Sequence, residues 1–287
     1  MQPHHLPSHK AAPDDVLYQY PSVLREQIDT APSAPGVYTF HGDNGSYPLY
    51  IGKSVNIRAR LLSHLRTTRE TRLLAQTSHI SYIPTAGEIS ALLLEAQMIK
   101  QQQPLFNRRL RKTRDTCSFV LNGSGLDIQY TSEMADAATD NVYGLFKSQR
   151  SAKDRLRELA DEHGLCLAVL GVEPNTKGRG CFRSAIRKCA GACCGREAIE
   201  EHTERLRHAL DAFKIAAWPY SGAIALAEQF GRLREYHVLR NWRYHGSYKS
   251  IRGLKSFTLQ EDMLFDADMY KILVKPILLE TAQIIEI

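Results

Sequence analysis

The sequence predicts an α+β protein. We expect a small N-terminal domain with a three-stranded antiparallel sheet and flanking helices, then a cysteine-rich metal-binding module, then a mixed α/β C-terminal region. Two runs of β-branched and aromatic residues, 37–40 and 49–52, flank the turn signal Asn44-Gly45 and predict a hairpin. Apolar residues at helical spacing follow the hairpin, and further along several cysteines lie in a short basic, glycine-rich segment.

The first predicted helix of the N-terminal domain leaves directly from the hairpin. Ser54 is a candidate N-cap for a helix over 55–66, because Ile57, Leu61 and Leu65 recur there every four residues. We therefore expect this helix to pack one apolar face against the hairpin.

Capping and stop signals predict the remaining elements of this domain. Thr85 and Glu88 have the spacing of a capping box, and Pro104 stops the helix that follows. We expect a helix over 21–30, a strand over 79–84 and a helix over 89–102.

Composition and charge point to a nucleic-acid partner. The chain has 287 residues, 43% hydrophobic and 24% charged, which is ordinary for a globular protein of two or three small domains. Its formal net charge of +6 is concentrated in three segments, 53–72, 100–114 and 177–196, in which Glu70 is the only acidic residue. Clustered cations of this kind favour a polyanionic partner.

The termini and the cysteines indicate a reducing compartment. Residues 1–15 are polar and lack the apolar segment of a signal peptide, and no apolar run approaches a membrane span. We therefore expect a cytoplasmic protein with a mobile tail at 1–20 and no membrane association. Its six cysteines are then expected as thiolate ligands or free thiols.

The hairpin and the helix after it carry a set of residues suited to a phosphodiester. The hairpin presents Tyr38 and Tyr50, and Lys53, Arg60 and His64 follow at spacings of seven and four. At those spacings we expect the three basic residues to share one face. This set favours a nuclease over a structural role.

Two tripeptides in this region, Gly36-Val37-Tyr38 and Tyr50-Ile51-Gly52, resemble the motif of the GIY-YIG nucleases, with Val37 in place of the usual isoleucine. Further residues occur at offsets that resemble the excinuclease UvrC family, in particular its short members that lack a second nuclease domain. These residues are Arg60, His64, Glu95 and Asn107. The resemblance is strong over 34–195 and weak over the remainder.

The resemblance implies metal-dependent hydrolysis of a phosphodiester. Glu95 would hold one Mg²⁺ or Mn²⁺, ions that prefer oxygen ligands and keep several waters. Tyr50 would act as the general base, and Tyr38 would position the water or the phosphate. From the residues alone these two tyrosines could exchange roles.

Four more residues receive supporting roles. Arg60 would bind non-bridging phosphate oxygens, and Lys53 would lower the pKa of a neighbouring tyrosine. His64 would contact the scissile phosphate. Asn107 would orient either the tyrosine or the DNA backbone.

The cysteine block predicts a metal centre. Cys166, Cys181, Cys189 and Cys193 are separated by 15, 8 and 4 residues and can converge on one site, although the spacing lacks Cys-x-x-Cys knuckles. The block resembles that of UvrC, which implies a 4Fe–4S cluster, but the gap after Cys166 departs slightly from longer members. Zinc and unligated thiols remain alternatives. Cys117, a predicted strand residue, and Cys194 are left out of the ligand set.

The rest of the chain shows no catalytic pattern. We expect strands between 116 and 147 around a turn at 122–125, and a helix that opens at Ser151 and ends near Gly164. Further along, the sequence predicts an amphipathic helix over 197–218, a helix over 223–229, and strands over 236–240 and 270–274. We read Asp266 and Asp268 as a turn before the last strand.

We therefore expect a structure-specific DNA endonuclease of nucleotide excision repair that makes one incision on the 3′ side of a lesion. The resemblance implies damaged double-stranded DNA and UvrB, after UvrA loading, as partners of a monomeric chain. Alternatives are a homing or restriction nuclease and a non-catalytic iron–sulfur DNA-binding protein. The predicted divisions are a tail 1–20, a nuclease domain 21–114, a connector 115–164, a cysteine-rich module 165–196 and a C-terminal region 197–287.

Overall fold

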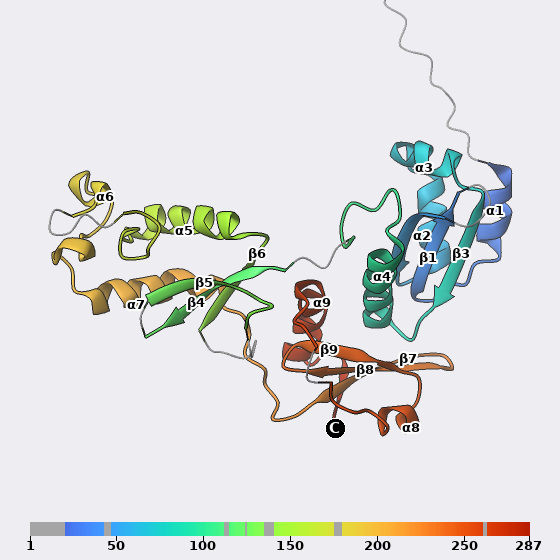
Figure 1. Ribbon diagram of the computed structural model, residues 1–287. Helices are drawn as coiled ribbons and strands as arrows, with labels where there is room; N and C mark the ends of the chain where they lie inside the picture. Colours follow the sequence, from blue (N-terminus) through green and yellow to red (C-terminus); the bar gives the residue numbers. More distant parts are fainter. Residues whose placement is uncertain are drawn as a thin grey trace, which may run out of the picture.

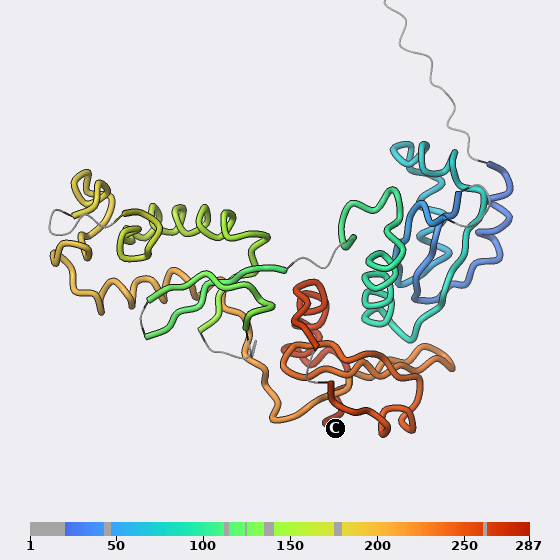
Figure 2. Tube along the Cα trace, in the orientation of Figure 1, coloured from blue at the N-terminus to red at the C-terminus, as the bar shows by residue number. Residues whose placement is uncertain are grey.

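The computed structural model describes residues 21–42, 47–111, 115–123, 125–134, 141–174, 180–260 and 263–287. The predicted tail at 1–20 and the Asn44-Gly45 turn lie outside these residues. In the described chain, three antiparallel sheets follow one another, and the middle one extends away from the other two (Figures 1 and 2). The domain limits set from the sequence stay a prediction.

The N-terminal sheet confirms the expected hairpin and third strand. It consists of β1 (Gly36–His41), β2 (Pro48–Ser54) and β3 (His79–Pro84), in the order β2-β1-β3 with antiparallel pairing throughout. Because β1 is central, its side chains Val37, Tyr38 and Phe40 are almost completely buried.

Helices cover this sheet. They are α1 (Ser22–Asp29), α2 (Ile57–Leu65), the short η1 (Thr68–Glu70), α3 (Thr71–Ala75) and α4 (Glu88–Gln102). Three of them were predicted (α1, α2 and α4), and the two short ones, η1 and α3, were not predicted. Leu24, Ile57 and Leu61 pack around Phe40 in one core. Within the described ranges, no helix has both the length and the apolar character that crossing a membrane requires.

The predicted cap of α2 is wrong by two residues. Asn56, in an extended conformation, accepts a hydrogen bond from the backbone N–H of Ala59 at 3.0 Å. Ser54 still belongs to β2, and its hydroxyl oxygen accepts the N–H of Asn56 at 3.0 Å. The helix therefore starts at Ile57 rather than at residue 55, because the strand runs further than its β-forming residues indicate.

Gly52 allows two tyrosine rings to approach the backbone. It pairs with Tyr38 across β1 and β2. A Cβ atom at Gly52 would overlap the Tyr38 hydroxyl and lie 2.8 Å from Cε1 of Tyr50. Any larger residue would push these rings apart.

Helix α4 lies between two cores. Its Ile99 packs with Val37 and Ile51 of the N-terminal sheet. Its Leu93 and Ala96 belong to a second core, formed mainly by the C-terminal region. Figure 1 shows α4 between the N-terminal sheet and α9. The apolar residues of this helix are therefore divided between two partners.

The start of α4 is capped by a distant residue, and the predicted capping box is wrong. The Thr85 hydroxyl donates to the carbonyl oxygen of Gly87 at 2.9 Å and makes no cap. The Glu228 carboxylate instead accepts the N–H of Ile89 at 2.9 Å and the N–H and hydroxyl of Ser90, both at 2.6 Å. A carboxylate at a helix N-terminus also interacts favourably with the helix dipole.

A buried histidine extends this cap. His237 is fully buried, and its Nε2 lies 2.9 Å from the Ser90 hydroxyl and 3.5 Å from the Glu228 carboxylate. Its Nδ1 lies 2.5 Å from the Ser247 hydroxyl. Gly87 permits the approach, since a Cβ atom there would overlap the Glu228 carboxylate.

The middle sheet confirms the strands expected between 116 and 147. It contains β4 (Cys117–Asn122), β5 (Gly125–Tyr130) and β6 (Val142–Phe146), in the order β5-β4-β6. The helices of this part are α5 (Gln149–His163), α6 (Phe182–Ala185), η2 (Ala192–Cys194), α7 (Ile199–Leu210) and η3 (Asp211–Phe213). Leu156 of α5 and Leu206 of α7 share a core with Phe119.

The helix predicted to open at Ser151 opens slightly earlier. Ser148 is its N-cap, and the Ser148 hydroxyl oxygen accepts the N–H of Ser151 at 3.2 Å. Gly164, with φ of 65°, ends the helix in the left-handed conformation, as expected.

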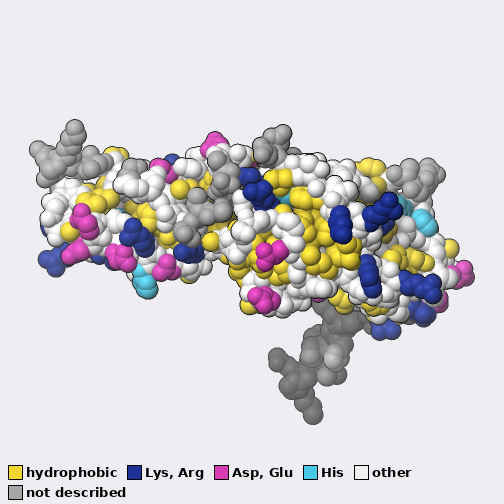
Figure 3. Space-filling view, turned by 90° about the horizontal axis from the view of Figure 1, so that it is seen from below, with side chains coloured by type: hydrophobic (Ala, Val, Ile, Leu, Met, Phe, Trp, Pro, Cys, Tyr) yellow, Lys and Arg dark blue, Asp and Glu magenta, His cyan; other side chains and the backbone are white. Residues whose placement is uncertain are grey.

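The C-terminal region forms a third sheet and two helices. Its elements are β7 (Ile224–Phe230), β8 (Leu233–Arg240), β9 (Arg243–Tyr248), β10 (Gln283–Glu286), α8 (Ile251–Leu254) and α9 (Ala267–Leu278). The strand order is β10-β7-β8-β9. Ile251, Leu264 and Leu279 are exposed here, and Figure 3 shows hydrophobic side chains gathered on the face seen from below.

Two predictions for this region are wrong. The segment 223–229, expected as a helix, forms β7, because pairing with both β8 and β10 overrides its helix-forming residues. The segment 270–274, expected as a strand, lies within α9. Asp266 is the N-cap of that helix and accepts the N–H of Asp268 at 2.9 Å, so it does not form a turn before a strand.

We predict that Glu228→Ala lowers the free energy of unfolding by about 1–3 kcal/mol, since buried donors at the start of α4 lose their acceptor. Urea denaturation measures this change. Glu286→Ala, on an exposed position of β10, is the control and should change stability little. Equal effects of the two substitutions would contradict the capping role.

The effect of Glu228 should depend on pH. Burial alone would raise the pKa of Glu228, but hydrogen bonds from His237, Ser90 and Ile89 outweigh burial and lower that pKa. A lowered folded-state pKa stabilises the protein above the unfolded value and loses this contribution as pH falls through the folded value. The stability difference between the wild type and Glu228→Gln should therefore be full at pH 7 and shrink below about pH 4.

We predict that Gly52→Ala destabilises the N-terminal domain, because the added methyl group overlaps the Tyr38 ring. Gly123→Ala is a matched control, since nothing lies within 4 Å of a Cβ atom at that position. Thermal unfolding followed by near-ultraviolet tyrosine signals tests both variants. Unchanged unfolding of Gly52→Ala would show that the rings move aside at no cost.

Candidate active site

Three aromatic rings meet where β1, β2 and α2 adjoin. The ring centroids of Tyr38 and Tyr50 are 6.3 Å apart, and the His64 ring lies 5.3 Å from Tyr38 and 5.9 Å from Tyr50. The Tyr38 hydroxyl lies 2.7 Å from Nε2 of His64. The two sequence-predicted tyrosines are therefore adjacent, and a histidine of α2 holds one of them.

His64 lies in the interior, where it contacts Tyr38 and Glu70. Its side chain is 1% exposed, and its Nδ1 pairs with the Glu70 carboxylate. Burial lowers the pKa of His64, although the neighbouring Glu70 acts against this shift. A neutral ring that donates a hydrogen bond from Nδ1 to Glu70 can accept one at Nε2 from the Tyr38 hydroxyl.

These contacts correct two expectations. Lys53 lies in β2, Arg60 is exposed on α2 and His64 points inward, so the three do not share a helical face. With both ring nitrogens occupied, His64 contacts a tyrosine instead of an open surface. Glu70 was missed as a site residue, although its position as the only acid in a basic stretch was a usable signal.

Arg60 places a positive charge beside the tyrosines. Its guanidinium hydrogen-bonds to Tyr38, and this bond together with the charges of Tyr38 and Tyr50 raises the pKa of Arg60. Because the Arg60 side chain is otherwise exposed, its remaining donors face solvent. The residue can therefore hold an anion next to both hydroxyl groups.

Burial raises the pKa of both tyrosines. For Tyr38 burial is the largest cause and the charge of Tyr50 adds to it; for Tyr50 burial is again the largest, followed by the charge of Glu95. Arg60 is the cation that lowers the pKa in both cases. The expectation that Lys53 lowers a tyrosine pKa is therefore wrong, and the Lys53 ammonium group lies 2.5 Å from the Glu88 carboxylate.

Glu95 projects from α4 toward the same group of residues. One of its carboxylate oxygens accepts the backbone N–H of Lys53 at 3.1 Å. Burial raises the pKa of Glu95, and the Lys53 hydrogen bond and charge partly oppose this. A half-buried carboxylate near two phenolic oxygens offers the hard oxygen ligands that Mg²⁺ or Mn²⁺ prefers.

Asn107 fastens the strand that carries Tyr50. Its side-chain oxygen accepts the N–H of Ile51 at 2.9 Å, and its amide nitrogen donates to the carbonyl oxygen of Ile51 at 2.8 Å. Asn107 is 8% exposed, so its side-chain polar groups serve this pair of bonds. Its contact is with the backbone next to Tyr50 rather than with the tyrosine hydroxyl.

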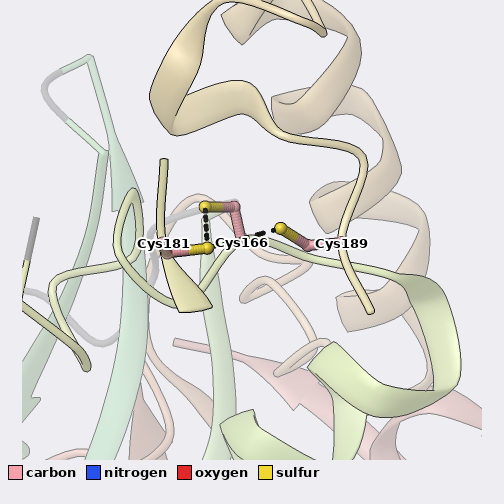
Figure 4. A group of neighbouring side chains, drawn as sticks. All are labelled: Cys166, Cys181 and Cys189. Carbon is pink, nitrogen blue, oxygen red and sulfur yellow. Dashed lines mark hydrogen bonds between the residues drawn. The ribbon is translucent and has the colours of Figure 1, made fainter. Parts of the chain in front are cut away.

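The predicted cysteine ligands converge in the middle part of the chain. The sulfur atoms of Cys166, Cys181 and Cys189 all lie within 4.8 Å of one another and are buried, and Figure 4 shows the three side chains directed toward one another. The separations are 3.8 Å for Cys166–Cys181 and 3.5 Å for Cys181–Cys189. Burial and the adjacent thiols raise the pKa of Cys189 to about 12.

The two remaining cysteines of this segment differ in position. The Cys193 sulfur accepts the N–H of Cys181 at 3.2 Å and so borders the cluster. The Cys194 sulfur lies 3.2 Å from the Gly191 carbonyl oxygen, outside the group of three. Thiolates are soft ligands suited to zinc or iron–sulfur centres, so the donors present fit such a centre.

Three family models match successive parts of this chain. Residues 34–108 match the UvrC-like GIY-YIG domain, residues 117–212 match the middle domain of UvrC/Cho excinucleases, and residues 223–287 match the excinuclease Cho C-terminal domain. The three matches together extend over nearly all of the described structure.

Curated proteins show the same similarity. Excinuclease Cho of Escherichia coli K12 is 48% identical over 271 residues, which cover 94% of this chain and 92% of the relative. UvrABC system protein C of Rhodopseudomonas palustris BisB18 is 31% identical over 195 residues, 66% of this chain and 28% of the relative. The magnesium-bound GIY-YIG N-terminal endonuclease domain of UvrC from Thermotoga maritima is 34% identical, with a TM-score of 0.28, and covers 30% of this chain and 98% of that structure. The chain therefore belongs to the UvrC/Cho family of GIY-YIG excinucleases, which incise DNA in nucleotide excision repair.

Proposed function

We propose that this protein makes a single metal-dependent incision on the 3′ side of a DNA lesion, in a complex with UvrB that UvrA has loaded. The observation that carries the proposal is the convergence of Tyr38, Tyr50, Arg60 and Glu95 at one point of the N-terminal domain. This grouping supplies an anion-binding cation, two phenols and one carboxylate. The described chain shows one such grouping, which supports one cut per complex.

Each residue has a role that its surroundings support. Glu95 would hold the Mg²⁺ or Mn²⁺ ion, which when bound would neutralise charge on the phosphate. Tyr50 is the proposed general base, and Arg60 is the proposed ligand of the phosphate oxygens. Tyr38, held by His64, would position the attacked phosphate or the water.

The His64–Glu70 pair would act through Tyr38. Glu70 sets the orientation of the His64 ring, and Nε2 of that ring then accepts a hydrogen bond from the Tyr38 hydroxyl. We assign both as positioning residues, because the His64 side chain is buried and Glu70 acts on Tyr38 through the His64 ring. Asn107 would in the same way position Tyr50 through the backbone of Ile51.

We also propose that Cys166, Cys181, Cys189 and Cys193 bind a 4Fe–4S cluster, with zinc as the alternative. The resemblance of the cysteine block to that of UvrC supports the cluster. The sulfur separations support zinc, since a Zn–S distance of ~2.3 Å places neighbouring ligands about 3.8 Å apart in a tetrahedral site. Either centre would hold the segment between α5 and α7, which has few large apolar residues.

The proposed incision is tested with a lesion-bearing, end-labelled duplex incubated with UvrA, UvrB, ATP and Mg²⁺. We expect one nick at a fixed distance on the 3′ side of the lesion with wild-type protein. Tyr50→Phe and Glu95→Gln should reduce nicking by about 10²–10⁴-fold or more, because each removes a catalytic group but little volume.

Activity of the wild type should rise toward alkaline pH, because the raised pKa of Tyr50 leaves the phenol protonated at neutral pH.

Matched variants make this test specific. Tyr47→Phe removes an exposed hydroxyl next to the same strand, and Glu26→Gln removes an exposed carboxylate on α1. Both should nick at the wild-type rate. A sequence-positioned cut would indicate a homing or restriction nuclease, absence of any cut would favour a non-catalytic DNA-binding protein, and two nicks per lesion would show a second active site.

The metal centre is tested by purification without oxygen followed by metal analysis and absorption spectroscopy. An iron–sulfur cluster should give a brown protein whose visible absorbance bleaches on oxidation, whereas zinc thiolate is colourless. Cys189→Ser should lose the metal and destabilise the middle part of the chain. Cys194→Ser, outside the cluster, should keep it; metal loss in both variants would refute the ligand assignment.

A further inference from the structure

A cleft of about 890 Å³ opens beside the nuclease domain. Its charged residues come from three parts of the chain: the segment 108–111 after α4, Lys147 after β6, and the start of α9. Two of these parts are far from the nuclease motif in sequence. The folded chain therefore builds a surface that none of its parts forms alone.

The cleft is lined by an excess of positive charge. Five cations contribute to it: Arg108, Arg109, Arg111, Lys147 and Lys271. The two acids in the lining, Asp266 and Asp268, already have a partner, because both pair with Lys100 of α4 and Asp266 also caps α9. Lys100 balances one of these two carboxylates, so the five cations of the lining still outweigh the remaining negative charge.

The cations are available to a ligand. Arg108, Arg109, Lys147 and Lys271 are exposed, and none of them forms an ion pair with another residue of the described ranges. Among the residues that the structure describes, the Arg111 side chain donates one hydrogen bond, to the Gln103 carbonyl oxygen at 3.4 Å, and it forms no ion pair there, so its charge is not neutralised by them. Several uncompensated cations in one cleft attract an anion with more than one charge.

The cleft is connected to the active site by a short, fixed segment. Asn107 binds the backbone of Ile51 next to Tyr50, and the cationic run starts at the following residue. Leu110 adopts a φ of 62°, which is uncommon for a branched residue, and it is held by packing against the core that contains Val37 and Ile51. The arginines on either side of Leu110 are thus presented at a set position relative to Tyr50.

We propose that this cleft binds the phosphodiester backbone of the DNA that flanks the incised bond. The inference rests on the proposed nuclease function and adds a second contact region to it. A backbone suits the cleft because its repeated charges match cations that come from three separate segments. The side chains of Arg108, Arg109, Lys147 and Lys271 are exposed and long, which suits phosphate contacts without base recognition.

The test uses the double variant Lys147→Gln/Lys271→Gln of the full chain. Binding of a fluorescent duplex is measured by anisotropy at several salt concentrations without added Mg²⁺, so that no cleavage occurs. Each lost phosphate contact should reduce the salt slope of log K by about one, so we expect a fall of about two. The dissociation constant should rise on the order of ten-fold or more at ~0.1 M salt.

The control is Lys153→Gln/Lys255→Gln, which removes the same charge from exposed positions of α5 and of the segment after α8. It should leave the affinity and the slope near wild-type values. Equal losses in the two double variants would mean that total charge matters rather than the cleft, and would overturn the inference. Inorganic phosphate at constant ionic strength should not displace the duplex; displacement would show a site for a free anion instead.

Binding and nicking measured on the same proteins distinguish failure of this inference from failure of the proposed function. Lesion-specific nicking by the wild type, with unchanged binding and nicking by the cleft variant, would refute the cleft and leave the nuclease function intact. A wild type that makes no nick, but whose binding depends on Lys147 and Lys271, would refute the proposed incision and support the cleft.

Discussion

Helix α4 is the element on which the rest of the structure depends, because it carries Glu95 and belongs to two cores at once. Ile99 packs on the N-terminal sheet, while Leu93 and Ala96 pack on the C-terminal region. The Glu228 carboxylate supplies the acceptor that the helix start lacks locally. The position of Glu95, the candidate metal ligand, is therefore set partly by residues more than a hundred positions away. The C-terminal region can in this way influence a nuclease domain that folds around a different sheet.

Contacts with neighbouring residues hold the active-site groups in place. The Tyr38 hydroxyl is fixed by His64, and that histidine is oriented by Glu70. On the other side of the site, Glu95 accepts the backbone N–H of Lys53. Each reactive group is thus positioned by a second residue, which reduces the reorganisation needed when a phosphodiester arrives.

Local patterns in the sequence predicted correctly those features of the fold and the site that contacts between nearby residues determine. The hairpin around Tyr38 and Tyr50, the helix carrying Glu95 and the grouping of Cys166 with Cys181 all agree with the structure. The predictions are wrong where contacts with residues distant in the sequence determine the local structure. Residues 223–229 form a strand because two neighbouring strands pair with them, and the cap of α4 comes from Glu228, which no local box could reveal. The inward direction of His64 depends on Glu70 and on a tyrosine from another element.

The raised pKa of Tyr50 is compatible with its proposed role as the base. A phenol with a raised pKa is a stronger base once it has lost its proton, although a smaller fraction is deprotonated at a given pH. Arg60 already lowers this pKa, and positive charge held by Glu95 would act in the same direction, since the Glu95 carboxylate is itself one cause of the shift. A cation at Glu95 would therefore cancel the negative charge that raises the pKa of Tyr50. Its positive charge would also favour the deprotonated phenol. With Tyr50 as the proposed base and Glu95 as the proposed metal ligand, this arrangement would couple loss of the Tyr50 proton to the presence of a cation at Glu95.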